Sequence, residues 1–135
     1  EKGMIVPVFD ARRSQVYAGA FVWRDGEIRE AVPGGAYLLE EFLAKLSEES
    51  AQSGNRRVVL FGDGCVPYGE KITACCEEQG ISCVTDGRTQ RAGSVVRLAR
   101  DLFKAGALLE YGQLHPEYMR KAEAERKLEE MRERK

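Results

Sequence analysis

The sequence predicts an α/β domain built on a mixed β-sheet. Three strand-like segments follow one another at the start of the chain, and helical and strand-like segments then alternate. Short turns join the first three strands, whereas the later strands are separated by stretches long enough for crossover helices. The expected order is β-β-β-α-β-α-β-α. An antiparallel three-stranded meander followed by αβαβα gives a mixed sheet, and we expect helices on both of its faces.

The first three strands are separated by recognisable turn signals. Met4–Phe9 is nearly all apolar, as in a buried strand, and Gln15–Trp23 is rich in β-branched and aromatic residues. Asp25-Gly26 is a strong signal for a two-residue hairpin. Glu27–Val32 then alternates charged and apolar residues, and we expect Pro33–Gly35 to end this third strand.

Helical and strand signals alternate in the rest of the domain. Apolar residues at helical spacing predict an amphipathic helix over Tyr37–Gln52 and a second over Pro67–Gln79. Short strands are expected at Arg57–Phe61 and Ile81–Val84. A third helix is expected over 94–107, with Ser94 as a possible N-cap. The residues of this helix that we expect in the core are Val95, Leu98, Ala99, Leu102 and Phe103.

The last part of the chain has a different composition. From Lys121 to Lys135 nearly every residue is Ala, Glu, Arg or Lys, and Glu123 and Lys127 form a Glu-first i, i+4 pair. We therefore predict one compact domain over residues 1–116 and a charged helix or tail over residues 117–135. This tail is either solvated or docks on a partner.

Composition excludes several classes of protein. With 21 Lys and Arg, 22 Asp and Glu and a formal net charge of −1, the chain has no global field that would attract nucleic acid. No apolar run approaches the length of a membrane span. The 4 cysteines contain no CxxC pair, so reduced thiols in a cytoplasmic protein are the better interpretation. We expect no metal site and no cofactor.

Three segments resemble a known family. Val6–Ala18 is similar to the PxxDARxxxVY segment of the TsaB family, also called YeaZ. Val59–Gly64 resembles the family's strand and Gly-Asp-Gly turn, and Pro116–Arg120 resembles its PxYLR ending. These segments occur in family order and span almost the whole chain. The resemblance implies the C-terminal subdomain of an actin-like or ribonuclease-H-like fold. On this reading the family's N-terminal half would precede Glu1.

The resemblance also implies a function. TsaB is the partner protein in bacterial tRNA threonylcarbamoyladenosine biosynthesis. A family member would be a non-catalytic scaffold that associates with the TsaD paralogue and the ATPase TsaE, and would meet tRNA only through that complex. The modified base would be adenosine 37 of tRNAs that read codons beginning with A. The alternative is the adenosine-side subdomain of an actin-like nucleotide-dependent enzyme. A third possibility is an RNA-binding module, which the balanced charge does not favour.

Two turns supply candidate site residues. Gly62, Asp63 and Gly64 follow a strand at the edge where open α/β sheets bind ligands, so they are candidates to lie near a nucleotide. They also fit a plain turn, since no Walker lysine or GxGxxG accompanies them. The other candidates for partner or phosphate contact are Asp10, Arg12 and Arg13. The alternative is that Asp10 holds the turn backbone while both arginines are solvated.

Other polar residues point to interaction more than to catalysis. Tyr118 and Arg120 precede the charged tail and are candidate partner contacts, although a terminal helix with internal ion pairs would look the same. Cys65 lies near a helix start, which could lower its pKa, but a packed thiol is the simpler reading. His115 has no nucleophile motif beside it, so we predict no catalytic residue. Removal of a neighbouring half-domain would expose apolar surface, so self-association is expected for the isolated chain.

Overall fold

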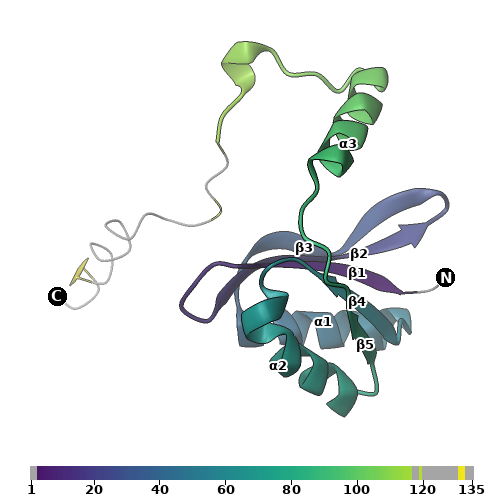
Figure 1. Ribbon diagram of the computed structural model, residues 1–135, viewed down its shortest axis with the longest axis vertical. Helices are drawn as coiled ribbons and strands as arrows, with labels where there is room; N and C mark the ends of the chain where they lie inside the picture. The colour runs from purple at the N-terminus through teal and green to yellow at the C-terminus, as the bar shows by residue number, and fades with distance from the viewer. Residues whose placement is uncertain (1–2, 117–118, 120–130, 133–135) are drawn as a thin grey trace. The chain divides into compact units, whose positions relative to one another are not determined.

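The computed structural model describes residues 3–116, 119 and 131–132, and the chain divides into two compact units, Glu1–Gln90 and Arg91–Lys135 (Figure 1). The element order confirms the predicted β-β-β-α-β-α-β-α. The elements of the first unit are β1 (Met4–Asp10), β2 (Gln15–Arg24), β3 (Glu27–Leu38), α1 (Leu39–Ser53), β4 (Arg57–Phe61), α2 (Cys65–Glu78) and β5 (Ser82–Thr85). The described elements of the second unit are α3 (Ala92–Lys104) and a short 3₁₀ helix, η1 (Tyr111–Gln113).

The sheet is mixed, as the sequence predicts. Its strand order is β3-β2-β1-β4-β5. Strands β1 and β2, and β2 and β3, pair antiparallel, whereas β4 pairs parallel with both β1 and β5. The carboxyl ends of β1, β4 and β5 therefore meet at one edge of the sheet. This edge is where open α/β sheets place their ligands.

The β2–β3 hairpin confirms the Asp25-Gly26 signal. Both residues have positive φ, 55° for Asp25 and 83° for Gly26. This is the conformation of a type I′ turn, whose twist matches that of the two strands it joins. The pairing of Arg24 with Glu27 closes the hairpin directly at the turn.

The expectation that Pro33–Gly35 ends the third strand is wrong. Strand β3 continues to Leu38, and its partners on β2 run from Arg24 back to Gln15. Irregular register between Ala18 and Phe21 absorbs the interruption. Among the described strands β3 is at the edge of the sheet, where a proline that lacks an N–H is tolerated. Tertiary pairing here overrides the local turn signal.

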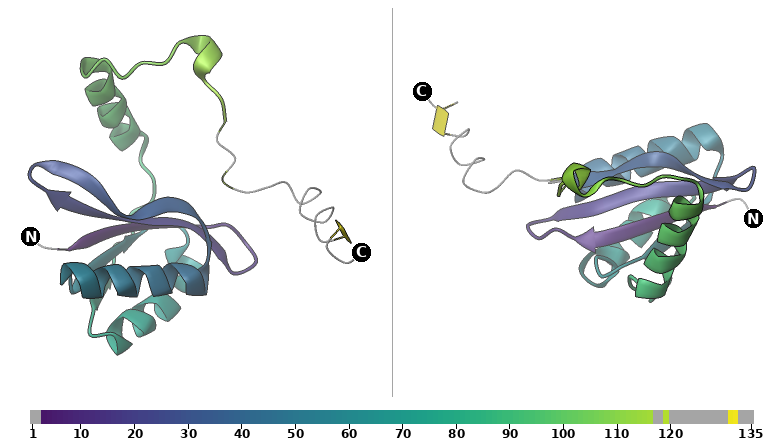
Figure 2. Two further views of the ribbon diagram at one scale, coloured as in Figure 1. Left: turned by 180° about the vertical axis from the view of Figure 1, so that it is seen from behind. Right: turned by 90° about the horizontal axis from the view of Figure 1, so that it is seen from above.

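The core lies between one face of the sheet and two helices. Figures 1 and 2 show α1 and α2 on the same side of the sheet. The sheet contributes alternate residues of β1 and β4, such as Val6 and Leu60, and α1 contributes Phe42, all with no exposed surface. Helix α2 adds Ile72 and Cys76. A helix on the second face of the sheet remains a prediction.

The expected core role of the third helix is not seen within its own unit. Helix α3 has no buried residue: Leu98, Leu102 and Phe103 are 62%, 46% and 65% exposed. The 3.6-residue spacing correctly predicts the helix, but burial needs a packing partner as well as a pattern. Ser94 is not the N-cap, because the helix already begins at Ala92 and Arg91 occupies that position without a side-chain cap. Among the described residues no helix is long and apolar enough to cross a membrane.

Candidate functional site

The first part of the candidate site is the turn between β1 and β2. Arg12, Arg13 and Ser14 all have positive φ, 65°, 55° and 59°. Non-glycine residues rarely adopt this conformation, so surrounding contacts must hold it. The Asp10 Oδ1 atom accepts a hydrogen bond of 2.8 Å from the Arg12 backbone N–H. The Gln15 N–H also donates to the Arg12 carbonyl at 3.1 Å. The turn is thus a fixed loop that presents two arginines.

The second part is the Gly62-Asp63-Gly64 turn after β4, which packs directly on β1. Gly62 has φ 101°, and a Cβ there would lie 2.3 Å from the Val8 carbonyl oxygen. A Cβ on Gly64 would lie 2.8 Å from the Val8 side chain. The Gly64 N–H donates to the Val8 carbonyl at 3.0 Å. Both glycines are therefore required by the close approach of two backbones, whether or not a ligand binds.

Asp63 joins the two turns. Its Oδ1 atom accepts a hydrogen bond of 3.1 Å from the Asp10 backbone N–H. Tyr68, in the first turns of α2, donates its hydroxyl to Asp10 Oδ1 at 3.2 Å. The structure thus brings together Asp10 and Asp63, which are 53 positions apart in the chain. Both carboxylates hold backbone or a tyrosine hydroxyl in place, and the Arg12 and Arg13 residues beside them are exposed.

The charged side chains of these turns differ in how much of their surface is exposed to solvent. Arg12 has an 87% exposed side chain and lies 3.8 Å (Nε) from Asp10 Oδ2, whose own side chain is only 22% exposed. Partial burial, together with the negative charge of Asp10, raises the pKa of Tyr68 above its ordinary value. Tyr68 therefore stays protonated at neutral pH and remains a donor to Asp10.

A third polar group at this edge was missed by the sequence reasoning. The Arg88 guanidinium donates to both oxygens of Asp86, with Nε 2.8 Å from each, and lies 5.4 Å from the centre of the Phe61 ring. The Arg88 carbonyl accepts a hydrogen bond of 3.2 Å from the Gly62 N–H. The ion pair with Asp86 raises the pKa of Arg88. The available signal was a polar Asp-Gly-Arg turn directly after the short strand β5.

Other candidate residues lie elsewhere or outside the described residues. Tyr118 and Arg120 fall outside the described residues, so their role remains a prediction. His115 is exposed in the segment after η1. The suggestion that the start of α2 lowers the pKa of Cys65 is wrong: burial raises it, and Cys83 and Asp63 add to this effect. In the described part of the chain no cluster of His, Cys, Asp or Glu is arranged to hold a metal ion.

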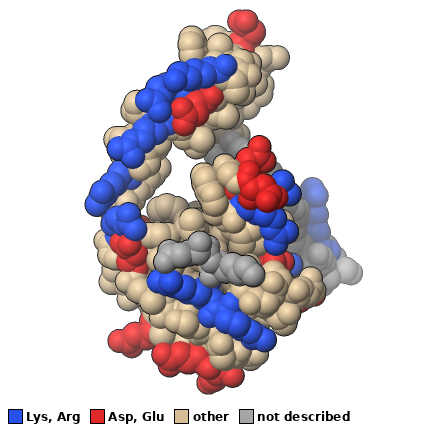
Figure 3. All heavy atoms as spheres, turned by 90° about the vertical axis from the view of Figure 1, so that its right-hand side faces the viewer, with Lys and Arg blue, Asp and Glu red and all other residues tan. Residues whose placement is uncertain are grey.

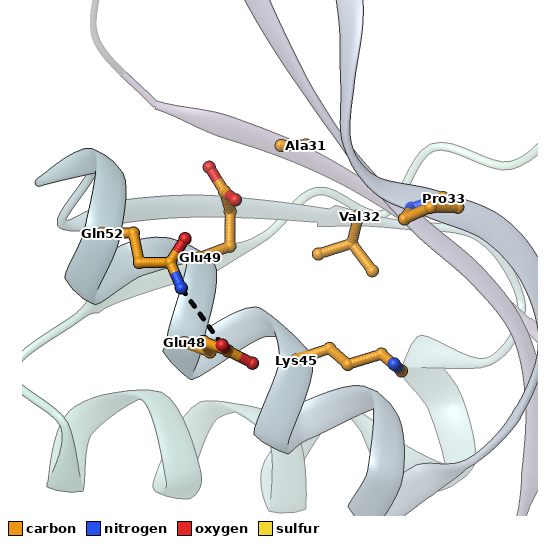
Figure 4. A pocket seen from close by; sticks show the side chains of 7 residues that line it. All are labelled: Ala31, Val32, Pro33, Lys45, Glu48, Glu49 and Gln52. Atoms are coloured by element: carbon orange, nitrogen blue, oxygen red, sulfur yellow. Dashed lines mark hydrogen bonds between the residues drawn. The ribbon is translucent and has the colours of Figure 1, made fainter.

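Two surface hollows lie away from this edge. One, between β3 and α1, is drawn in Figure 4, where Gln52 Nε2 donates to Glu48 Oε1 at 3.1 Å and the Lys45 side chain extends along the opening below Val32. The other lies between α1 and α2, over Leu43 and Ala74. Figure 3 shows both cationic and anionic side chains on the surface of the described residues. Neither hollow has a set of converging polar groups that would define a reaction.

The sequence of this chain is similar to that of a protein of known function. The chain is 30% identical over 125 residues to the tRNA threonylcarbamoyladenosine biosynthesis protein TsaB of Bacillus subtilis (strain 168), a match that covers 93% of the chain. Over this match the chain is similar to the TsaB family. It spans 51% of the length of that TsaB relative. No protein-family model matches it.

A solved structure supports the fold of this chain. A Pseudomonas aeruginosa protein, described as uncharacterised with similarity to peptidase YeaZ, superposes with a TM-score of 0.60 at 21% sequence identity. The alignment covers 88% of this chain and 50% of that one. At this identity the likeness bears on the fold, and it confirms the predicted YeaZ-like α/β architecture.

Proposed function

We propose that this chain is the C-terminal subdomain of a non-catalytic scaffold protein in the formation of N6-threonylcarbamoyladenosine at position 37 of tRNAs that read ANN codons. The observation that carries the proposal is the 30% identity to TsaB across 93% of the chain. The partners would be a TsaD-like paralogue and a TsaE-like ATPase, with tRNA contacted through the complex in the cytoplasm.

The site chemistry is compatible with a scaffold. Asp10 and Asp63 accept hydrogen bonds from the backbone and from Tyr68, so their oxygens serve to fix two turns. Fixed turns suit recognition, because little conformational entropy is lost when a partner binds them. The outward-facing Arg12 would then meet acidic or carbonyl groups on the partner through its planar, bidentate guanidinium.

A co-purification experiment with the TsaD-like protein of the same organism tests this proposal. The full-length protein that contains this chain is compared with a variant carrying Arg12→Glu and Arg13→Glu. The matched control is Arg24→Glu and Arg29→Glu, which makes the same charge change at the far hairpin. We expect the control to bind like the wild type and the turn variant to bind at least tenfold more weakly. Equal binding by all three would remove the β1–β2 turn from the interface.

The second candidate function is the adenosine-side subdomain of an actin-like nucleotide-dependent enzyme. The observation in its favour is the place of Gly62–Gly64 at the carboxyl edge of three parallel strands, beside the Phe61 ring and Arg88. Isothermal titration of the full-length protein with ATP and ADP separates the two functions. Nucleotide binding that is weakened by Asp63→Ala would support the nucleotide-dependent enzyme. The absence of any heat of binding would contradict this function and favour the scaffold protein.

A further inference from the structure

A pair of thiols joins α2 to β5 and has no role in the proposed function. Cys76 lies on the inner side of α2 and is 2% exposed. Cys83 lies on β5, opposite the buried Val58 of β4, so it faces the same core, and it is only partly buried. The Thr73 hydroxyl of α2 lies 3.7 Å from the Cys83 sulfur, and Cys76 follows Thr73 by three residues on the same helix, so both cysteines lie where α2 meets β5. The buried Cys76 thus lies on the part of α2 that faces the partly buried Cys83.

The surroundings of Cys83 favour its thiolate. The neighbouring Cys76 thiol lowers the pKa of Cys83, and the Thr73 hydroxyl, which donates to the Cys83 sulfur at 3.7 Å, lowers it further. Burial and the nearby Glu77 carboxylate oppose this effect, and the net result is a pKa of about 7 for Cys83. The same contacts, together with burial, raise the pKa of Cys76. At neutral pH a substantial fraction of the molecules therefore carries a thiolate on Cys83, whereas Cys76 keeps its proton.

Access also favours Cys83. Among the described strands β5 is at the edge of the sheet, so no further strand covers it on that side. A small oxidant can reach Cys83 but not Cys76, which is enclosed by the core. A partly accessible thiolate beside a protected thiol is the usual arrangement of an attacking and a resolving cysteine.

We propose that Cys83 and Cys76 form a peroxide-reactive pair that closes to a disulfide between β5 and α2. The Cys83 thiolate attacks one oxygen of hydrogen peroxide, the O–O bond breaks, and the hydroxide that leaves takes up a proton to become water. Cys83 is then a sulfenic acid. The Cys76 sulfur gives up its proton and attacks the Cys83 sulfur, the S–O bond breaks, and a second water leaves. Two thiols are oxidised, and one peroxide is reduced to two waters.

The other two cysteines are internal controls. Burial raises the pKa of Cys65, which makes it a poor nucleophile at neutral pH. Cys75 is next to Cys76 in sequence but lines the hollow between α1 and α2. If proximity in sequence or exposure alone decided the partner of Cys83, Cys75 or Cys65 would form a disulfide with Cys83 as readily as Cys76 does.

Peptide mapping of the full chain after treatment with equimolar hydrogen peroxide tests the pair. Trypsin releases Ile72–Arg88, which contains Cys75, Cys76 and Cys83. Disulfide formation removes two hydrogens from the mass of this peptide. Cleavage after Glu77 then gives two fragments that stay joined until a reductant is added. We expect Cys75→Ser to form the same cross-link at the wild-type rate. Cys76→Ser should stop at a Cys83 sulfenic acid, which dimedone traps.

A variant that keeps both cysteines tests the pair even if the cysteine variants fail to fold. Thr73→Val removes one donor to the Cys83 sulfur, and we expect cross-linking at pH 7 to slow several-fold while the circular dichroism spectrum stays that of the wild type. Alkylation of Cys83 by iodoacetamide should rise with a midpoint near pH 7. Cross-links through Cys75 or Cys65, or a Cys83 midpoint at the ordinary thiol value near 9.0, would overturn the proposal.

Discussion

The two units of the chain differ in what their apolar residues contact. In the first unit, Leu39, Phe42 and Leu46 of α1 are at most 1% exposed because they pack on the inner face of the sheet. In the second, Leu98 and Leu102 of α3 have the same helical spacing and are 62% and 46% exposed. Two helices with similar patterns therefore differ in burial. Periodicity selects the helix, and only a partner surface turns its apolar side into a core.

The largest expected effect comes from opening the core of the first unit. Phe42→Ala removes a ring with no exposed surface that also contacts Tyr37, with ring centres 5.7 Å apart. Deletion of a buried aromatic ring costs about 3–5 kcal/mol of the free energy of unfolding. Urea unfolding followed by circular dichroism measures the loss.

The matched substitution in the second unit is Phe103→Ala. Phe103 is 65% exposed, so we expect the free energy of unfolding to change by no more than about 0.5 kcal/mol. An effect as large as that of Phe42→Ala would mean that the apolar side of α3 has a partner surface. The contrast between the two units would then disappear.

The next largest effect concerns backbone packing at the candidate site. Gly62→Ala places a Cβ 2.3 Å from the Val8 carbonyl oxygen, at a φ of 101°. Strain and overlap together should destabilise the protein by about 2 kcal/mol or more. The control is Gly26→Ala, at a φ of 83° but with nothing within 4 Å of the new Cβ. It carries only the conformational cost, about 1 kcal/mol. Equal effects in thermal unfolding would argue against a tight contact at Gly62.

A smaller effect is expected from separating the two turns. Asp63→Ala removes the acceptor for the Asp10 N–H and should cost about 1 kcal/mol of stability. Asp63→Asn keeps an oxygen at the same place and should restore most of it. Amide hydrogen exchange at Asp10 reports the bond directly, and unchanged exchange in Asp63→Ala would show that another group holds this turn.

Tyr68 makes the stability of the folded protein depend on pH in the alkaline range. Its pKa is raised in the folded protein, so the folded state binds the proton more tightly than the unfolded chain does. The resulting stability is fully present below the ordinary value of 10.0 and is lost as the pH rises through the folded pKa. The tyrosinate absorbance of Tyr68 should therefore appear above pH 10.0. Tyr68→Phe should lack this late step, and a step at the ordinary value would contradict the hydrogen bond to Asp10.

The smallest effect is expected at the surface of the helical layer. Lys71 Nζ lies 2.6 Å from Glu40 Oε1, and this contact lowers the pKa of Glu40, but the two side chains are 56% and 69% exposed. Solvent and salt screen such pairs. Lys71→Met should therefore change the unfolding midpoint by less than Gly62→Ala at any salt concentration. A clear loss that high salt abolishes would show that this ion pair contributes more than its exposure indicates.

The sequence predicted much of the candidate site, although not why its residues are needed. The Asp10–Arg13 turn and the Gly62–Gly64 turn were recognised from turn residues that follow apolar strands. The hydrogen bond from the Asp10 N–H to Asp63 could not be predicted, because it joins residues 53 positions apart. The need for glycine at position 62 depends likewise on the Val8 carbonyl of another strand. Arg88 was missed because its turn follows a short, weakly signalled strand.

Local chemistry alone determined the order of the elements, the type I′ hairpin at Asp25-Gly26 and the helical character of α1, α2 and α3. These features depend on side-chain spacing and on backbone preferences within a few residues. Only the tertiary structure decided that β3 continues through Pro33 and that Cys83 lies against α2. It also decided that the apolar side of α1 is buried while that of α3 is exposed within its own unit. Each of these depends on surfaces brought together from distant parts of the chain, and a local pattern carries no information about such partners.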